Sequence, residues 1–303
     1  MSSEIPSAQQ AMNENALRQT LARRATMASV FVALILIMTK TWAYWSTGSV
    51  SLLGSLLDSL LDGVTSLINF LALRAALQPA DDDHRFGHGK LESIAALAQS
   101  AFMIGSASVL VLNSFDAMLA QRALENNEVG VGVSVLAIVL TLGLVSYQSY
   151  VMKKSQSLIV EADSLHYKGD LMMNAAVIAA LLIADLGWFW FDGAMAILIG
   201  VYLLYSAWQV GKRAFEELMD QHVPELDERV QEIVSQSPGT EGCHDVRCRR
   251  SGPHIFIQFH LELDENLSLW SAHEIGDRIE KSIMAEYPMA EVIIHHDPVK
   301  VVS

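Results

Sequence analysis

The chain has 303 residues and a formal net charge of -14, and it is 51% hydrophobic and only 18% charged. Soluble globular domains carry about 25% charged residues, so the low charged fraction and a mean hydropathy of +0.30 exclude an ordinary soluble protein. The composition predicts an integral membrane protein with a soluble part, and the acidic balance is a poor match for nucleic acid as a partner.

The first 24 residues are polar, and we expect this N-terminal cytoplasmic segment (1–24) to be mobile or only locally helical. The apolar run after Arg23 and Arg24 is too long for a signal-peptide core and lacks a small-residue cleavage site, so we interpret it as a retained first membrane helix. A transmembrane domain at residues 25–212 is predicted, because six apolar runs reach or approach the roughly 20 residues needed to cross a bilayer. The six α-helices are expected near residues 26–46, 51–77, 91–116, 129–152, 160–185 and 190–211.

The placement of arginine and lysine predicts the orientation of these helices. Basic residues gather at the N-terminus, between the second and third helices, between the fourth and fifth, and after the sixth, whereas the alternate loops hold almost none apart from Arg122. Both termini are therefore expected to be cytoplasmic. Lys40 lies toward the outer end of the first helix, and we expect its ammonium group to snorkel to the outer interface.

Residues 213–303 predict a small cytoplasmic domain. A short link with an amphipathic helix, two strand-like runs, a second amphipathic helix and a last short strand follow one another, at residues 216–239, 244–252, 254–263, 268–288 and 290–297. The order α-β-β-α-β predicts an α+β domain with its helices on one face of a three-stranded sheet. About ninety residues suffice for a small core, and such a domain often gains stability by dimerising.

Two pairs of metal-ligand residue types lie inside the apolar helices. Asp58 and Asp62 are four residues apart, as are His166 and Asp170, so each pair shares one helix face. A charge at membrane depth costs a few kcal/mol or more and is usually paired and functional. Each pair lies about ten residues, or roughly 15 Å, from the first end of its helix, so the four groups can meet as a tetrahedral site for a divalent transition metal. The alternatives are separate polar residues that hydrogen-bond between helices, or a proton relay.

The loop before the third helix, ADDDHRFGHGK, is a second candidate metal site. Gly87 and Gly89 would let this loop fold around an ion, and the alternative is a solvated acidic turn with incidental histidines. The candidate ligands are Asp81, His84 and His88.

Lys90 and Asp220 sit at the predicted cytoplasmic boundary of the membrane with opposite charges. They can pair between the third helix and the start of the soluble domain, within or between subunits. The alternative is that both charges are solvated.

The soluble domain holds a third set of ligand types: His244, His260, His273, His295, His296 and Asp297. Strand alternation places Ile257, Phe259 and their even-spaced neighbours on a core face and leaves His260 on the opposite face. In the last strand, His295 and Asp297 share a face, so we prefer them as ligands over His296. His244 at a strand start and His273 on the second helix can complete one or two sites, and the alternative is a surface sprinkled with histidines.

These motifs together resemble the cation diffusion facilitator family, in particular its bacterial zinc and ferrous-iron efflux branch of YiiP-type transporters. DSLLD, PADDDHRFGHGKLES, the HxxxD of ADSLHYKGD and the terminal VIIHHDP align with family patterns over residues 20–302. In this order and spacing the motifs are highly specific.

The resemblance implies six transmembrane helices plus a cytoplasmic domain of metallochaperone-like fold. It also implies a homodimer in the bacterial inner (plasma) membrane, held through the cytoplasmic domain and the membrane junction. It further implies a transport site at Asp58, Asp62, His166 and Asp170, a loop site at Asp81, His84 and His88, a binuclear site at His244, His260, His273, His295 and a bridging Asp297, and a charge interlock between Lys90 and Asp220. His296 stands at a position that varies in the family.

The activity implied by the resemblance is export of a divalent metal from the cytoplasm in exchange for protons, by alternating access. The ligand chemistry agrees, because metal binding displaces protons from its ligands. Mixed nitrogen and oxygen ligands suit Zn²⁺, Cd²⁺, Fe²⁺ and Co²⁺, of which we favour Zn²⁺ as substrate and as structural or regulatory ion. An enzyme is not expected, since the chain has no HExxH signature. The alternative function is a membrane metal channel gated by a metal-sensing cytoplasmic domain.

Overall fold

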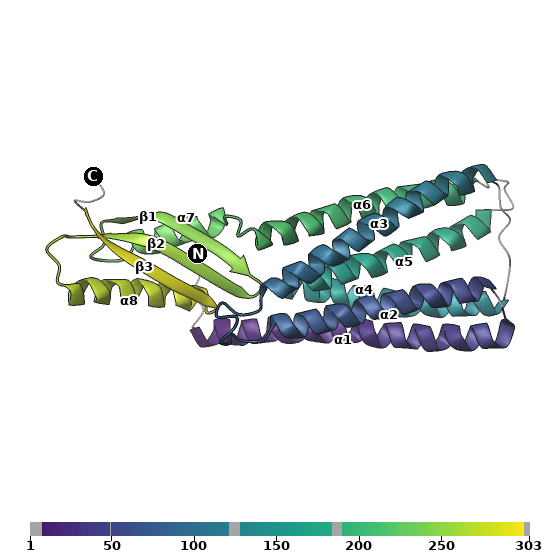
Figure 1. Ribbon diagram of the computed structural model, residues 1–303, viewed down its shortest axis with the longest axis horizontal. Coiled ribbons are helices and arrows are strands. Elements are labelled where there is room, and N and C mark those ends of the chain that lie inside the picture. The colour runs from purple at the N-terminus through teal and green to yellow at the C-terminus, as the bar shows by residue number, and fades with distance from the viewer. Residues whose placement is uncertain (1–7, 49, 121–127, 184–189, 300–303) are drawn as a thin grey trace, which may run out of the picture. The chain divides into compact units, whose positions relative to one another are not determined.

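The computed structural model describes residues 8–48, 50–120, 128–183 and 190–299 (Figure 1). The chain divides into two compact units. One unit contains Gln19–Gln78 and Leu91–Phe215, and the other contains Met1–Arg18, Pro79–Lys90 and Glu216–Ser303. The loop at Pro79–Lys90 therefore belongs with the C-terminal domain, although it lies between two of the long helices in sequence.

Six long helices precede the C-terminal domain in the described part of the chain, as the sequence predicts. The first, α1, begins at Ala8, so the expectation of a mobile or only locally helical N-terminal segment is wrong from that residue onward. Residues 8–24 contain no Pro or Gly and are rich in Ala, Leu, Arg and Gln, which have high helix propensity. Arg122 and residues 184–185 of the expected fifth helix lie outside the described residues. The helices are α1 (Ala8–Thr47), α2 (Val50–Ala76), α3 (Lys90–Ala120), α4 (Glu128–Ser155), α5 (Leu158–Ile183) and α6 (Trp190–Leu218).

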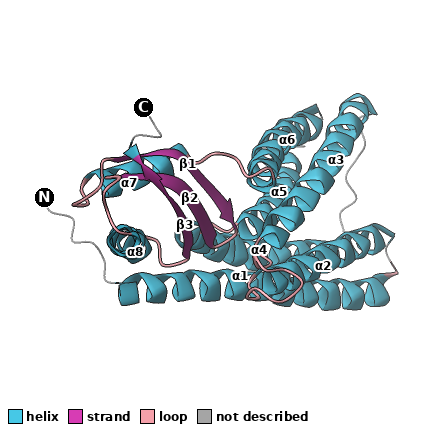
Figure 2. Cartoon of the chain, turned by 60° about the vertical axis from the view of Figure 1, so that its left-hand side comes forward, coloured by secondary structure: helices cyan, strands magenta, loops and turns pink. Residues whose placement is uncertain are grey.

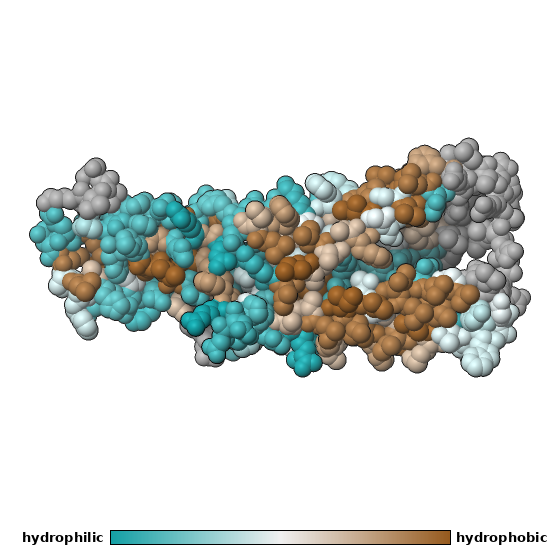
Figure 3. All heavy atoms as spheres, viewed as in Figure 1, coloured by the Kyte–Doolittle hydropathy of each residue, from teal (hydrophilic) through white to brown (hydrophobic). Residues whose placement is uncertain are grey.

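The helical unit has the surface of a membrane domain. Among the helices in the described residues, α1, α2, α3, α4 and α6 are long and apolar enough to cross a bilayer. The helix α5 is not among them, because its first half carries four charged side chains between Glu161 and Asp170. Large apolar side chains such as Phe31 and Trp208 are exposed, and hydrophobic side chains cover much of the visible face of this unit (Figure 3). Contact with lipid accounts for so much exposed apolar surface.

Small side chains let the helices of this unit pack closely. Ala96, Ala162 and Ala207 are almost fully buried where α3, α5 and α6 meet, as is usual between membrane helices. At Gly169 of α5, an added Cβ would lie only 3.0 Å from the Leu203 side chain of α6. The glycine therefore allows α5 to approach α6 one residue before Asp170.

The C-terminal domain has the predicted α-β-β-α-β order (Figure 2). Its three-stranded sheet has the order β1-β2-β3, with β1 and β2 antiparallel and β2 and β3 parallel. Ser268 caps α8 by accepting a hydrogen bond from the backbone N–H of Ser271. The elements are α7 (Pro224–Ser235), β1 (Gly242–Ser251), β2 (His254–Leu263), α8 (Leu269–Glu286) and β3 (Ala290–Pro298).

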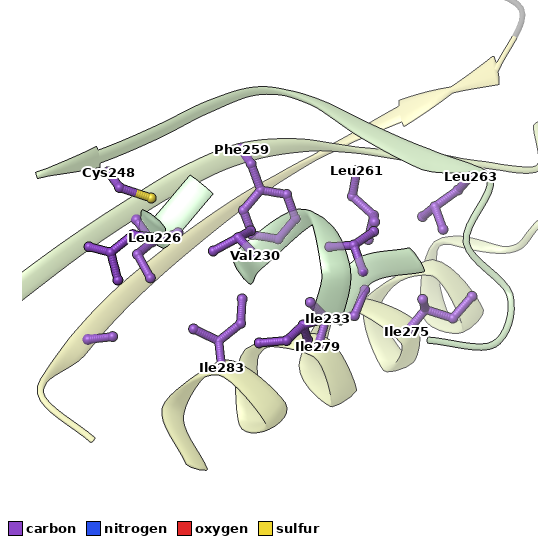
Figure 4. Packing of buried hydrophobic residues seen from close by; sticks show 13 residues of the cluster. Leu226, Val230, Ile233, Cys248, Phe259, Leu261, Leu263, Ile275, Ile279 and Ile283 are labelled. Atoms are coloured by element: carbon purple, nitrogen blue, oxygen red, sulfur yellow. The ribbon is translucent and has the colours of Figure 1, made fainter. Parts of the chain in front are cut away.

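The core of this domain lies between one face of the sheet and the two helices. Phe259 and Leu261 of β2 point toward Ile279 and Ile283 of α8 and Val230 of α7 (Figure 4). These side chains are at most 1% exposed, which confirms the predicted core face of β2. The opposite face of the sheet is left free to carry polar side chains.

Candidate metal sites

The helical unit brings a carboxylate of α2 against an imidazole of α5. His166 Nε2 lies 2.8 Å from Asp62 Oδ1 and 3.7 Å from Asp170 Oδ2. One ligand atom from each of these three residues lies within 4.8 Å of the other two. Asp58 lines the same cavity of about 420 Å³, but in the described chain its carboxylate is outside that group of three. The arrangement offers one nitrogen and two oxygens at once, with a carboxylate of Asp58 along the wall as a candidate fourth donor.

A contact beside the ligand cluster determines which sides of α2 and α5 face each other. Tyr167 is 1% exposed, and its hydroxyl is 2.9 Å from Ser66 Oγ. Ser66 is one turn beyond Asp62, and Tyr167 follows His166 directly. The hydrogen bond therefore holds the two helices together beside the ligand residues.

Lys40 does not snorkel outward, so the expectation from the sequence is wrong. Its ammonium group donates hydrogen bonds to the backbone oxygen of Ser55 at 3.0 Å and to Ser59 Oγ at 2.6 Å. Lys40 also lines the cavity that holds Asp58, Asp62, His166 and Asp170. The inward direction follows from these acceptors, because a buried cation gains more from hydrogen bonds and nearby carboxylates than from an apolar route to the interface.

Asp163 is a buried carboxylate that the sequence analysis missed. It is 1% exposed and accepts hydrogen bonds from Ser29 Oγ at 2.5 Å, Gln148 Nε2 at 2.7 Å and Asn69 Nδ2 at 3.1 Å. Asn69 also donates to Gln99, so one polar network links five helices. The available signal was a carboxylate in an apolar helix three residues before His166.

The loop residues Asp81, His84 and His88 form a second group of ligand atoms. Asp81 Oδ1 is 3.5 Å from His84 Nδ1, and Asp81 Oδ2 is 3.4 Å from His88 Nε2. The backbone N–H of His84 donates to Asp81, and this bond, with the nearby imidazoles, lowers the pKa of the exposed Asp81 carboxyl despite some desolvation. The Asp81 carboxylate is therefore an acceptor at neutral pH.

The two glycines of this loop have different roles. Gly87 has φ +76°, a conformation that favours glycine. At Gly89, an added Cβ would lie 2.1 Å from the backbone oxygen of Ser251. Gly87 therefore serves the turn, whereas Gly89 allows the loop to pack against the end of β1.

Three strands bring the third group together on the open face of the C-terminal sheet. His244, His260 and His295 stand in one row across β1, β2 and β3. Asp297 Oδ2 is 2.7 Å from His260 Nδ1 and 3.6 Å from His244 Nε2, and its Oδ1 is 3.2 Å from His295 Nε2. The hydrogen bond with His260 is the main reason that the pKa of Asp297 lies below its ordinary value.

Glu262 adds a partner that the sequence analysis did not select. Its Oε1 is 2.8 Å from His244 Nδ1, while the other ring nitrogen of His244 faces Asp297. A carboxylate on one nitrogen orients an imidazole whose second nitrogen is left to bind a metal.

His273 and His296 lie apart from this group within the single chain. The side chain of His296 reaches α8, where its Nε2 would be 2.6 Å from a Cβ added to Gly276. Burial is the main reason that the pKa of His296 is lowered. His273 Nε2 faces Asp277 on α8 at 3.6 Å. Strand alternation explains the position of His296, because it follows His295 and precedes Asp297; a ligand role for either histidine stays a prediction.

Lys90 and Asp220 form the expected ion pair, with Nζ 2.9 Å from Oδ1. Arg249 also donates to Asp220 at 3.2 Å, and its guanidinium lies over the rings of Phe86 and Phe256. Partial burial acts to raise the pKa of Asp220, but the hydrogen bonds from Lys90 and Arg249 outweigh it and lower that pKa. The pair therefore ties the end of the loop to the C-terminal domain within one compact unit.

The chain is similar to known proteins over most of its length. A family model described as the cation efflux transmembrane domain matches residues 26–219, and one described as the cation efflux protein, cytoplasmic domain, matches residues 223–299. The cation-efflux pumps FieF of Salmonella arizonae and Salmonella choleraesuis are each 46% identical over 283 residues, which covers 93% of this chain and 94% of theirs. A solved structure titled "Mode of Action of a Putative Zinc Transporter CzrB (Zn form)" is 28% identical, covers 26% of this chain and 92% of its own, and has a TM-score of 0.25.

The two family models, one over the long apolar helices and one over the α+β domain, define a membrane transporter of cations. The full-length match is specific enough to assign the family. The chain belongs to the cation diffusion facilitator family of cation-efflux transporters.

Proposed function

We propose that this protein exports Zn²⁺ from the cytoplasm in exchange for protons. The observation that carries the proposal is the meeting of Asp62, His166 and Asp170 within 4.8 Å inside a cavity of the helical unit. Asp58 lines that cavity and supplies the fourth ligand when the metal binds. Three carboxylates and one imidazole then surround a single divalent ion.

The donor set favours Zn²⁺ over other metals. One imidazole nitrogen and carboxylate oxygens suit Zn²⁺, and Fe²⁺, Cd²⁺ and Co²⁺ accept the same ligands. Both cysteines of the chain lie in the C-terminal domain, at Cys243 and Cys248. The membrane site therefore lacks the soft thiolates that select Cu(I).

Competition between metal and protons provides the coupling. Zn²⁺ binds deprotonated carboxylates and a neutral imidazole, so each binding event releases protons. In a state open to the cytoplasm the site takes up metal, and in a state open to the other side protons displace it. Alternating exposure of one site is sufficient for antiport, because the site carries either metal or protons in each direction.

The other clusters serve regulation and assembly. The group around Asp297 has two carboxylate oxygens facing three imidazoles, which suits a carboxylate that bridges two Zn²⁺ ions. The loop group at Asp81 offers a third, more exposed site. In this proposal the C-terminal domain binds cytoplasmic Zn²⁺, strengthens a homodimer and biases the membrane helices, and both termini lie on the cytoplasmic side of the bacterial inner membrane.

Substitution of the imidazole tests the site. Purified His166→Ala protein in proteoliposomes should lose Zn²⁺ transport, because the only nitrogen donor of the membrane cluster is gone. The matched control is His254→Ala, which removes a histidine at the start of β2, outside the ligand groups of the described residues. Transport by His166→Ala at the wild-type rate would overturn the assignment of the site.

A further inference from the structure

Lys40 is the cation in the helical cavity that the metal chemistry leaves unexplained. It is on α1, which supplies none of the four proposed ligands, yet it lines the cavity with all of them. Three of these ligands, Asp58, Asp62 and Asp170, are carboxylates that line the cavity with it. A lysine at this depth is costly unless it is matched by negative charge.

The hydrogen bonds of Lys40 fix the position of its ammonium group without neutralising its charge. Both acceptors are neutral: the backbone oxygen of Ser55 and the hydroxyl of Ser59, whose side chain is buried. Ser59 lies directly after Asp58 on α2 and three residues before Asp62. The ammonium group is therefore fixed beside the carboxylates and acts on them together rather than in one ion pair.

The sum of the charges at the metal-bound site explains why a cation is placed here. Three ionised carboxylates carry three negative charges, a ligating imidazole is neutral, and a divalent cation supplies two positive charges. The metal-bound site would keep one uncompensated negative charge inside the bilayer, which is unfavourable. One fixed ammonium group makes the loaded site neutral.

We infer that Lys40 is a positioning residue for the proposed transport reaction, a built-in counter-charge that matches the three-carboxylate site to a divalent cation. The inference rests on the proposed function. The positive charge limits how tightly the carboxylates hold the metal, so it favours release. Without it, the site attracts divalent metal more strongly and turns over more slowly.

The test compares Lys40→Met with Lys40→Arg in proteoliposomes, with Zn²⁺ as the transported ion. Initial rates at fixed pH and increasing Zn²⁺ should give a KM about tenfold lower for Lys40→Met, because one nearby positive charge has been removed. The maximal rate should fall as well. Lys40→Arg keeps the charge and should stay near the wild-type KM, and Ser59→Ala, which loosens the ammonium group, should fall between the two.

A role in packing alone would lower the rate without lowering KM, so an unchanged or raised KM in Lys40→Met overturns the inference. If transport by this variant is too slow to measure, equilibrium Zn²⁺ binding is measured in place of the transport rate. The comparison then uses detergent-solubilised protein with wild-type elution behaviour, in a background of Asp81→Ala, His88→Ala and His260→Ala. Tighter binding by Lys40→Met supports the inference, and equal or weaker binding contradicts it.

His166→Ala, measured in parallel, distinguishes a wrong role for Lys40 from a wrong transport site. Loss of transport in His166→Ala with a wild-type KM in Lys40→Met would reject the role of Lys40 as a counter-charge and leave the proposed transport site in place. Wild-type transport by His166→Ala would reject the proposed transport site and, with it, the role of Lys40.

Discussion

The cluster between the helices and the cluster on the sheet use the same residue types in different surroundings. In both, an aspartate is largely shielded, with side-chain exposures of 20% for Asp62 and 16% for Asp297. The imidazoles differ: His166 is 15% exposed, whereas His295 is 66% exposed. The helical cluster has a shielded imidazole and a lysine in the same cavity, although its third member, Asp170, is 41% exposed, while the sheet cluster is open on one side. Enclosure suits an ion that must be carried, and an open face suits ions that join to further ligands.

The largest effect expected from this contrast comes from matched substitutions of the two aspartates. Asp62→Asn should lower Zn²⁺ transport in proteoliposomes by about 100-fold or more, because loss of even an indirect partner of a metal ligand costs 10–100-fold. Asp297→Asn should change the rate by only a few-fold, since it acts through the soluble domain. Equal losses in the two variants would mean that the clusters do not differ in role.

Asp163 gives the next largest effect, on stability. Asp163→Ala leaves the donors of Ser29, Asn69 and Gln148 without their shared acceptor, at a cost of about 1–3 kcal/mol in the free energy of unfolding. Thermal unfolding in detergent should show a lower Tm. The control is Ser164→Ala on the same helix, because Ser164 Oγ is buried without a hydrogen-bond partner in the described structure. If the control loses as much stability, the network is not the cause.

Removal of Zn²⁺ from the sheet cluster should have a smaller effect on the stability of the protein. With Zn²⁺ at 100 times its Kd, binding stabilises a folded protein by about 2.7 kcal/mol, so a chelator should lower the Tm of the wild type. His260→Ala removes an imidazole that contacts Asp297, and a tenfold weaker site would lose about 1.4 kcal/mol of that gain. The difference in Tm with and without Zn²⁺ should therefore shrink in this variant. A full Zn²⁺-dependent shift in His260→Ala would place the stabilising ion elsewhere.

The smallest effect concerns the ion pair of Lys90 and Asp220, whose side chains are 36% and 43% exposed. Lys90→Met should cost about 1 kcal/mol or less at neutral pH. The pKa of Asp220 is depressed in the folded state, so its contribution is present above the ordinary value of 3.8 and is lost as pH falls through the lower folded value. The stability difference between wild type and Lys90→Met should be constant from about pH 5 to 8. A difference that changes within that range would assign the effect to another group.

Sequence periodicity revealed the features that depend on one element. The four-residue spacing of Asp62 and Asp58, and of His166 and Asp170, marks a helix face regardless of what packs on it. Strand alternation likewise predicted the core face of β2 and separated His296 from its neighbours. These patterns are local, so they could be read before any packing was known.

Features that depend on contacts between elements could not be read in this way. The direction of Lys40 is decided by acceptors on α2, fifteen and nineteen residues further along the chain. The hydrogen bonds of the buried Asp163 come from side chains of three other helices. Gly89 is explained by the backbone of β1 rather than by its own loop. In each case the physical cause is a neighbour that the sequence does not identify.

The most direct test of the central claim is Zn²⁺ movement against its own gradient. Wild-type proteoliposomes with equal Zn²⁺ on both sides would receive an imposed pH gradient, and internal Zn²⁺ and pH would be recorded together. Antiport predicts that Zn²⁺ moves toward the more acidic side while protons leave that side, and that both movements vanish in His166→Ala. Zinc that flows only down its own gradient, with no response to the imposed pH difference, would contradict proton-coupled export and indicate a channel.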